Sequence, residues 1–247
     1  MSKSIATERI AVISDVHGNL TALDAALAHI RASGIERIVN LGDLVGKGPN
    51  SALVIDRCRE TCQTILQGNW DAEVARATPS FQPGLWHHEQ LGAERNAYLA
   101  GLPGSVDMAF GGKRVRFFHA SEISPFHRVH ETAPRERHRA MFSNTEFTGF
   151  GPAPQLVGYG DIHVPYLINF QGFTLFNAGS VGNPLDEPRA CYCVLESDGA
   201  VPSLTLKFIR LDYDIEAEIA LARSMDSPDF EAYARELRTA VYRGRQA

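Results

Sequence analysis

The sequence predicts an α/β fold in which a second, mixed sheet packs on a largely parallel first sheet and helices lie outside both. Two observations indicate this fold. The first half of the chain alternates short apolar runs with amphipathic helical patterns, which is typical of strands joined by right-handed crossovers. From residue 106 onward, short apolar runs separated by turn residues favour hairpins instead. A chain of 247 residues can bury one sizeable core, so we expect a single domain over residues 1–247.

The first half of the chain is expected to supply the first sheet and its helices. Residues 9–14 predict a buried strand, and residues 20–33 predict a helix whose leucines share one face. Further strands are predicted at 38–41 and 64–66, and further helices at 51–60, 71–77 and 87–101. In such sheets ligands bind beyond the carboxyl ends of the strands, so polar residues that follow these strands are candidates for a functional site.

The second half is expected to form the second sheet and a helical C-terminus. Gly111 and Gly112 separate two apolar runs at 106–110 and 114–118, as a tight antiparallel turn would. Five more strand-like runs follow at 155–159, 166–170, 173–177, 190–196 and 203–211. A helical extension is predicted from about residue 214, with Ser227 as an N-cap and apolar residues at helical spacing through Val241.

The segment at about 122–154 is the least regular part of the chain, with a partly helical pattern around 132–142. One interpretation is a solvated excursion, because Glu131 and Glu136 dilute its positive charge. The other is a cap that faces the substrate. We favour the cap because the segment leaves directly from His119, a candidate site residue.

Composition limits the class of function. A net charge of −5 argues against a large basic surface for duplex nucleic acid. No secretory leader is visible and no apolar run is long enough to span a bilayer, so we expect a cytoplasmic protein without membrane contact. The four cysteines lack the spacing of structural zinc sites and are predicted to be reduced structural thiols. The sequence does not indicate an oligomeric state.

Side chains with metal-binding atoms follow five of the predicted strands, each directly after the strand ends. They are Asp15 and His17, Asp43, Asn69, His119, and Asp161 with His163. Taken singly, each has an ordinary explanation as a turn or surface residue. Their repeated strand-end placement predicts a site for two metal ions instead. Carboxylate, amide oxygen and imidazole together suit Mn²⁺, Fe or Zn²⁺ better than Ca²⁺.

The ordered motifs resemble those of the calcineurin-like metallophosphoesterases. The matching segments are residues 14–19, 42–46, 68–71, His119 and residues 160–163. Residues 48–50 and 177–184 make the chain look closest to a small bacterial branch labelled diadenosine-tetraphosphatase-related. The resemblance runs from about residue 9 to about residue 215 and implies a four-layer α/β/β/α sandwich with a dinuclear metal site at the strand ends.

The resemblance also implies an activity and the roles of the site residues. Asp15, His17 and His163 would hold the first metal, Asn69, His119 and Asp161 the second, and Asp43 would bridge both. Two divalent ions are implied, with Mn or Fe preferred and Zn as the alternative. A metal-bound hydroxide, positioned through Asp43, Asn69 and His119, would attack a phosphodiester, a phosphoanhydride or an activated phosphomonoester.

Two residues depart from the family pattern. Asp161 stands where relatives have a histidine, so it could be a harder, anionic ligand or could instead orient His119 or His163. Trp70 stands where many relatives have a histidine that protonates the leaving group, and indole has no acid function. Either His127 or His130 then supplies the acid, or the substrate has a good leaving group.

Three residues are candidates for contact with a small phosphorylated substrate such as a nucleotide. Trp70 could be an apolar wall or a stacking platform. Lys47 could bind a distal phosphate, although an exposed loop lysine is an equal alternative. Arg128 lies on the segment expected to cap the site. Two other functions stay open: a serine/threonine protein phosphatase, and a catalytically weak nucleotide-binding regulatory module.

Overall fold

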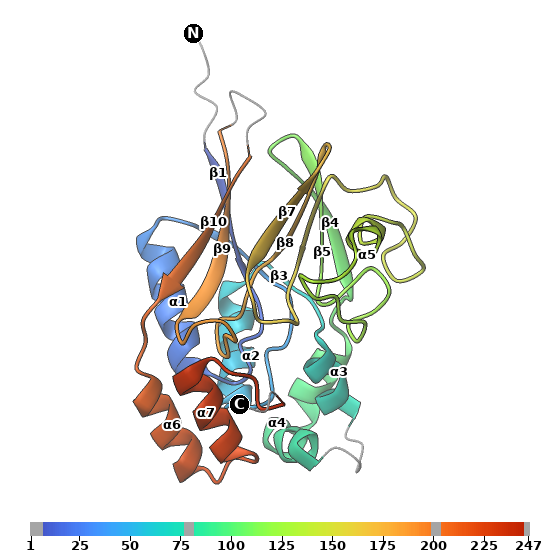
Figure 1. The fold of residues 1–247 in the computed structure, drawn as a ribbon. Coiled ribbons are helices and arrows are strands. Elements are labelled where there is room, and N and C mark those ends of the chain that lie inside the picture. The colour runs from blue at the N-terminus through green and yellow to red at the C-terminus, as the bar shows by residue number, and fades with distance from the viewer. Residues whose placement is uncertain (1–6, 77–81, 199–203, 245–247) are drawn as a thin grey trace.

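Two five-stranded mixed sheets pack face to face in the computed structural model, which describes residues 7–76, 82–198 and 204–244 (Figure 1). The first sheet consists of β1 (Glu8–Ile13), β2 (Arg37–Asn40), β3 (Thr64–Ile65), β9 (Ala190–Ser197) and β10 (Leu204–Leu211), in the order β10-β9-β1-β2-β3. Its three N-terminal strands are parallel, so their carboxyl ends meet at one edge of the sheet.

The second sheet has a parallel centre and antiparallel edges. Its strands are β4 (Ser105–Phe110), β5 (Lys113–Phe118), β6 (Leu156–Tyr159), β7 (Tyr166–Phe170) and β8 (Phe173–Asn177), in the order β4-β5-β6-β8-β7. Strands β5, β6 and β8 run parallel to one another, whereas β4 and β7 pair antiparallel with their neighbours. The hairpin predicted at Gly111 and Gly112 joins β4 to β5.

Helices lie outside the sheets, as Figure 1 shows. They are α1 (Leu20–Ala32), α2 (Ser51–Thr61), α3 (Asn69–Arg76), α4 (Gln82–Ala100), α5 (Arg135–Ala140), α6 (Ile215–Ser224) and α7 (Phe230–Thr239). Helix α4 is kinked at Gly92, where φ is 69° and ψ is 175°. Of the predicted ranges, residues 77 and 203 lie outside the described residues. No helix in the described ranges has the length and apolar character needed to cross a membrane.

Alternation along the strands divides the core into layers and confirms the four-layer sandwich. On β1, Ala11 and Ile13 belong to the core under the helices, whereas Ile10 and Val12 belong to the core between the sheets. This is the period of two that a strand with two buried faces requires. A third apolar layer, which includes Phe118, covers the outer face of the second sheet. The four cysteines are free thiols, as predicted.

The last hairpin, β9–β10, belongs to the first sheet and not to the second, contrary to the prediction. Strand β9 pairs antiparallel with β1, so that Cys193 lies opposite Val12. The first sheet is therefore mixed and less parallel than predicted. Strand periodicity identifies a hairpin, but it does not identify the sheet edge that the hairpin joins.

The predicted N-cap of the last helix is wrong. Helix α7 begins at Phe230 after Asp229, whose φ is 56°, and Ser227 lies two residues before that cap. The Ser227 hydroxyl is buried and has no hydrogen-bond partner within the described residues. The helix also ends at Thr239, so Val241 lies beyond it. A Ser-Pro pair satisfies many turns as well as helix starts, which explains the error.

Candidate metal centre

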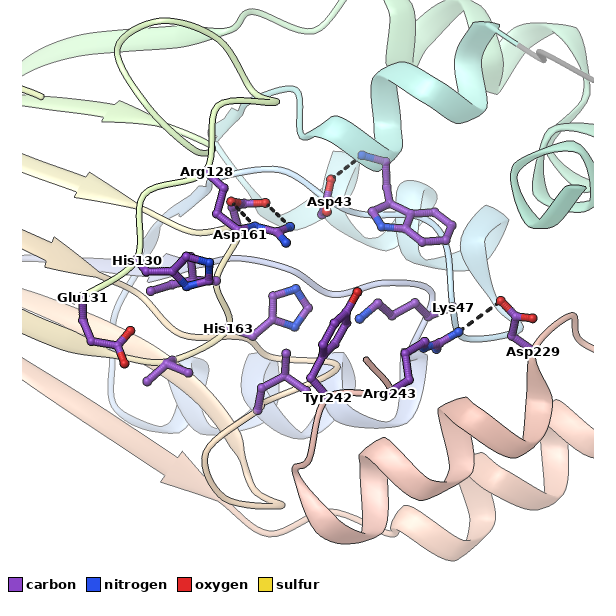
Figure 2. A pocket seen from close by; sticks show the side chains of 14 residues that line it. Asp43, Lys47, Arg128, His130, Glu131, Asp161, His163, Asp229, Tyr242 and Arg243 are labelled. Carbon is purple, nitrogen blue, oxygen red and sulfur yellow. Dashed lines mark hydrogen bonds and ion pairs between the residues drawn. The ribbon is translucent and has the colours of Figure 1, made fainter. Parts of the chain in front are cut away.

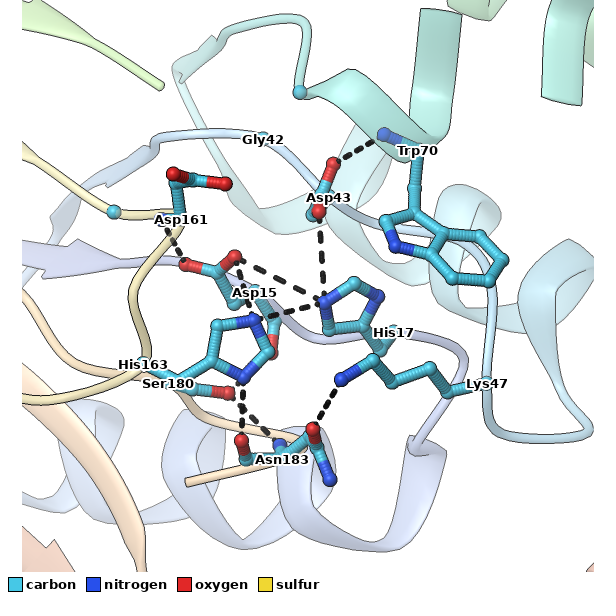
Figure 3. Close-up of polar contacts among 12 residues, drawn as sticks. Asp15, His17, Gly42, Asp43, Lys47, Trp70, Asp161, His163, Ser180 and Asn183 are labelled. Atoms are coloured by element: carbon cyan, nitrogen blue, oxygen red, sulfur yellow. Dashed lines mark hydrogen bonds and ion pairs between the residues drawn. The ribbon is translucent and has the colours of Figure 1, made fainter. Parts of the chain in front are cut away.

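The strand-end residues predicted from the sequence lie close together, and Figure 3 shows five of them, Asp15, His17, Asp43, Asp161 and His163. Asp15 and His17 follow β1, Asp43 follows β2, Asn69 begins α3 just after β3, His119 follows β5, and Asp161 with His163 follow β6. Ligand atoms within 4.8 Å of one another define two groups, one of Asp15, His17 and His163 and another of Asp15, Asp43 and His119. Both groups are buried.

The backbone at these positions has a left-handed conformation that residues with side chains seldom adopt. Asp15, His17, Asp43, Asp161 and His163 all have φ between 50° and 65°. Each such conformation costs about 1 kcal/mol and persists only where the surroundings enforce it. Here the turns hold one another, because the Asp15 amide donates to the Gly42 carbonyl at 3.0 Å and the His17 amide to the Asp43 carbonyl at 2.9 Å.

His17 and His163, which are predicted to hold the first metal, face each other through their Nε2 atoms. Nδ1 of His17 donates to the Val45 carbonyl at 3.0 Å, and Nδ1 of His163 donates to the Asn183 carbonyl at 2.5 Å. Since a carbonyl only accepts, Nε2 of each neutral ring carries a lone pair. The two Nε2 atoms lie 3.1 Å apart. Oδ1 of Asp15, 3.2 Å from Nε2 of His163, is buried and has no hydrogen-bond partner in the described part of the chain.

The second position repeats this arrangement. Nδ1 of His119 donates to the Leu41 carbonyl at 3.0 Å, so Nε2 presents a lone pair whenever the ring is neutral. That Nε2 lies 3.0 Å from Oδ1 of Asn69, which is also an acceptor. Oδ2 of Asp43 lies 3.5 Å from Nε2 of both His17 and His119. With neutral histidine rings, these converging acceptors fit a pair of cations, with Asp43 placed to serve both.

The electrostatics differ between the two histidines that face Asp43, because they favour a positive charge at His119 and disfavour one at His17. Burial lowers the pKa of His119, but the carboxylates of Asp43, Asp15 and Asp161 outweigh burial and raise it to about 10. Burial and the nearby Lys47 charge lower the pKa of His17 well below its ordinary value. The carboxylates thus attract a cation, and the oxygen and nitrogen donors are those that Mn²⁺, Fe and Zn²⁺ accept.

Asp71 supports the site, and the sequence reasoning assigned it no role. Its Oδ2 accepts from the amides of Asp43 and Gly68 at 2.8 and 2.9 Å, and its Oδ1 from those of Leu44 and Val45 at 2.9 and 3.3 Å. Burial and the Asp43 charge raise the pKa of Asp71 to about 7, whereas these amides act in the opposite direction. An acid in the first turn of α3, three residues after Gly68, was the available signal.

Lys47 is not the exposed loop lysine that was one alternative. Its side chain is 8% exposed, and Nζ donates to Oδ1 of Asn183 at 2.5 Å. Burial lowers its pKa. Asn183 therefore holds Lys47 through its side-chain oxygen and His163 through its carbonyl (Figure 3).

A cavity of about 500 Å³ opens in front of the candidate metal ligands (Figure 2). Its lining includes Asp43, Lys47, Trp70, Arg128, His130, Glu131, Asp161, His163, Asp229, Tyr242 and Arg243. Trp70 meets His17 edge to face with ring centroids 5.8 Å apart, so it forms a wall of this space. The irregular segment reaches the cavity through three of the lining residues, Arg128, His130 and Glu131. His127 is exposed and does not line it.

The Asp161 carboxylate has Arg128 as its partner. Arg128 Nε and Nη2 donate to its two oxygens at 2.9 and 2.8 Å. Oδ1 of Asp161 lies 3.9 Å from Nε2 of His119, on the side of the second position. The alternative role of Asp161, to orient His119 or His163, has no hydrogen bond to support it among the described residues. The Leu41 carbonyl holds the His119 ring, and the Asn183 carbonyl holds the His163 ring. Ligation by Asp161 stays a prediction.

The comparisons with known proteins agree with this geometry. The sequence model of the calcineurin-like phosphoesterase superfamily domain matches residues 9–200. Uncharacterized protein MJ0912 of Methanocaldococcus jannaschii is 29% identical over 230 residues, covering 84% of this chain and 88% of that protein. Phosphodiesterase YfcE of Escherichia coli K12 is 26% identical over 219 residues, covering 84% and 95%. The crystal structure of a metallophosphoesterase from Sphaerobacter thermophilus matches with a TM-score of 0.76 at 28% identity, covering 95% of this chain and 99% of that one.

The matched region contains every strand-end residue of the candidate site, from Asp15 to His163. The resemblance expected from the sequence is thereby confirmed. The chain belongs to the calcineurin-like phosphoesterase superfamily and is a hydrolase of phosphate esters.

Proposed function

We propose that this protein hydrolyses a phosphodiester, a phosphoanhydride or an activated phosphomonoester with two divalent cations. Asp15, His17 and His163 would hold the first cation, Asn69, His119 and Asp161 the second, and Asp43 both. The observation that carries the proposal is the position of Asp43 Oδ2, which lies 3.5 Å from Nε2 of both His17 and His119. A single anionic oxygen between two imidazoles can hold two cations that repel each other.

The bound cations would lower the pKa of a water between them and neutralise phosphoryl oxygens. The protein's own contribution is a set of donors held in fixed positions. Carbonyls fix the rings of His17 and His119, and Asp71 fixes the loop that carries Asp43. Lys47 adds a cation at the cavity wall. Such fixed charges need little reorganisation when charge develops on the phosphoryl group.

Protonation of the leaving group limits the substrate. Trp70 lines the cavity but has no acid function. Of the two histidines considered as acids, His130 lines the cavity and His127 does not. We therefore keep His130 as the acid candidate and favour substrates whose leaving group needs little protonation, as in diesters and anhydrides.

The cavity favours a small substrate over a folded phosphoprotein. The cavity, whose lining includes Arg128, Glu131 and Tyr242, has a volume of about 500 Å³, which suits a small molecule. The phosphodiesterase YfcE among the relatives supports the same substrate class. A nucleotide as substrate, a preference for Mn or Fe, and a cytoplasmic location belong to this proposal.

The test is hydrolysis of bis(p-nitrophenyl) phosphate by chelator-treated protein after addition of Mn²⁺. We expect activity with Mn²⁺ and a loss of at least about 1,000-fold in Asp43→Asn, because both cations lose the anionic oxygen that they share. Asp226→Asn is the matched control, since Asp226 also has a positive φ but is exposed and does not line the cavity. Folded wild-type protein without activity on diesters or on dinucleoside polyphosphates would favour a regulatory module instead. Preference for phosphopeptides would favour a protein phosphatase.

A further inference from the structure

Arg128 and Asp161 form an ion pair at the edge of the second metal position (Figure 2). The Asp161 carboxylate is 3% exposed, whereas the Arg128 side chain is 47% exposed. Both residues line the cavity. The guanidinium therefore reaches a buried carboxylate from the open side. Two parallel hydrogen bonds occupy both carboxylate oxygens, which is the strongest geometry available to an arginine and a carboxylate.

The same carboxylate faces the second metal position. Its Oδ1 lies 3.9 Å from Nε2 of His119, and the Asp161 amide donates to Oδ2 of Asp15 at 3.0 Å. The backbone contact fixes Asp161 between the two halves of the site. Asp161 can thus serve two kinds of cation, namely the guanidinium of Arg128 and a divalent ion beside His119.

The two metal positions differ in how their carboxylates are paired. At the first position, Oδ1 of Asp15 is buried and has no hydrogen-bond partner among the described residues. At the second, the Arg128 guanidinium already compensates the Asp161 charge. A divalent ion that enters the second position must either share the Asp161 carboxylate with the guanidinium or displace it, and in both cases it stays near a positive charge. Two positive groups that bind one carboxylate repel each other, and the repulsion is stronger in a partly buried site than in water.

We propose that Arg128 competes with the second divalent cation for Asp161, so that the second position binds metal more weakly than the first. This inference rests on the two-cation function proposed above. A guanidinium displaced from Asp161 remains beside the cavity, where a phosphoryl oxygen of the substrate is a suitable new partner. Metal loading and substrate binding would then be coupled through one arginine.

The experiment is calorimetric titration of chelator-treated protein with MnCl₂, which measures affinity and stoichiometry without any catalytic readout. For wild type we expect two binding events, with the second weaker. Arg128→Gln removes the competing charge and should tighten the second event roughly tenfold while leaving the first unchanged. Arg128→Lys keeps the charge without the paired hydrogen bonds and should fall between the two. Arg135→Gln is the control, because Arg135 lies on the same segment but over the Phe170 ring.

A second variant tests Asp161 itself. Asp161→Asn should weaken the second event, since an amide is a poorer ligand than a carboxylate. The inference is overturned if Arg128→Gln leaves the second affinity unchanged or weaker, or if Asp161→Asn does not affect it. Two binding events of equal affinity in wild type would overturn this inference but not the two-cation function. A single event in wild type and in every variant would also overturn the two-cation function.

Discussion

The Glu236 carboxylate of α7 lies 3.6 Å from the Lys47 amine in the loop after Asp43. Glu236 is fully buried and also accepts from Nε of Arg243 at 2.8 Å and from the Arg243 amide at 3.0 Å. Residues 229–243 thus reach the site from outside the region that matches the family, which ends at residue 200. The C-terminal extension therefore holds a cationic side chain at the cavity wall.

The Glu236 contact predicts a pH dependence of stability. Burial raises the pKa of Glu236, but Arg243 and Lys47 outweigh burial and lower it to about 2. Because the folded pKa is below the unfolded one, the native state binds fewer protons, and the stabilisation is present above pH of about 4.5 and is lost as pH falls toward 2. The shift corresponds to roughly 3 kcal/mol.

Glu236→Gln should remove this dependence. The variant should be less stable than wild type at pH 7, and the difference in unfolding free energy should shrink as pH falls from 5 to 3. Urea denaturation across that range measures it. Glu231→Gln, an exposed change on the same helix, should show no such trend. A difference that stays constant with pH would mean that the contribution of Glu236 does not depend on its charge.

The facing lone pairs of His17 and His163 predict strong stabilisation by metal. Two acceptors 3.1 Å apart are unfavourable until a cation lies between them, so Mn²⁺ should raise the melting temperature. At a hundredfold excess over Kd the gain is about 2.7 kcal/mol per cation, or roughly 5–10 °C. His163→Ala should lose at least half of that increment, whereas His29→Ala, remote from the site, should keep it. An equal Mn²⁺ increment in His163→Ala would exclude His163 as a ligand.

Substitution of Asp71 should lower stability and metal affinity, although Asp71 is not among the predicted metal ligands. In Asp71→Asn, one carboxylate oxygen becomes an NH₂ group that faces backbone N–H donors, so two of four hydrogen bonds are lost. We expect a loss of about 2–4 kcal/mol in unfolding free energy and weaker Mn²⁺ binding, because the turn that carries Asp43 loosens. Asp56→Asn, which breaks a partly exposed pair with Arg95, should cost at most about 1 kcal/mol. Equal costs for the two variants would contradict the role of Asp71.

The convergence of the strand-end residues could be predicted from sequence because strand ends obey a simple rule. Carboxyl ends of adjacent parallel strands meet at one edge, so Asp15 and Asp43 had to lie close together once their strands were recognised. The same rule placed His119 beside Asp161, because β5 and β6 are also parallel neighbours. The strand pattern in the sequence was enough to predict proximity for residues that directly follow adjacent parallel strands.

The partners of these residues could not be predicted, because they depend on packing between distant segments. The pair of Arg128 with Asp161 joins an irregular segment to a strand end, and no periodicity relates the two. Burial of Lys47 depends on the placement of α7 and of the loop that carries Asn183. The sheet joined by β9–β10 was likewise a matter of tertiary pairing.

The close contact between Gly46 and the Trp70 indole tests whether Trp70 is a fixed wall of the cavity. Gly46 has φ of 91°, and a Cβ there would lie 2.2 Å from Cε3 of the Trp70 indole, so Gly46→Ala must displace the ring. Gly112→Ala is the matched control, because Gly112 has φ of 72° but a Cβ added there would meet no described atom within 4 Å. Both variants incur the backbone cost of about 1 kcal/mol.

The difference between the two variants therefore isolates the indole contact. We expect Gly46→Ala to be less stable than Gly112→Ala by about 1–3 kcal/mol in urea denaturation, the usual cost of overpacking. Displacement of Trp70 into the cavity should also raise KM for bis(p-nitrophenyl) phosphate, whereas Gly112→Ala should leave KM unchanged. If Gly46→Ala matched Gly112→Ala in both stability and KM, the indole would have room to move, and Trp70 would not be a fixed wall of the substrate site.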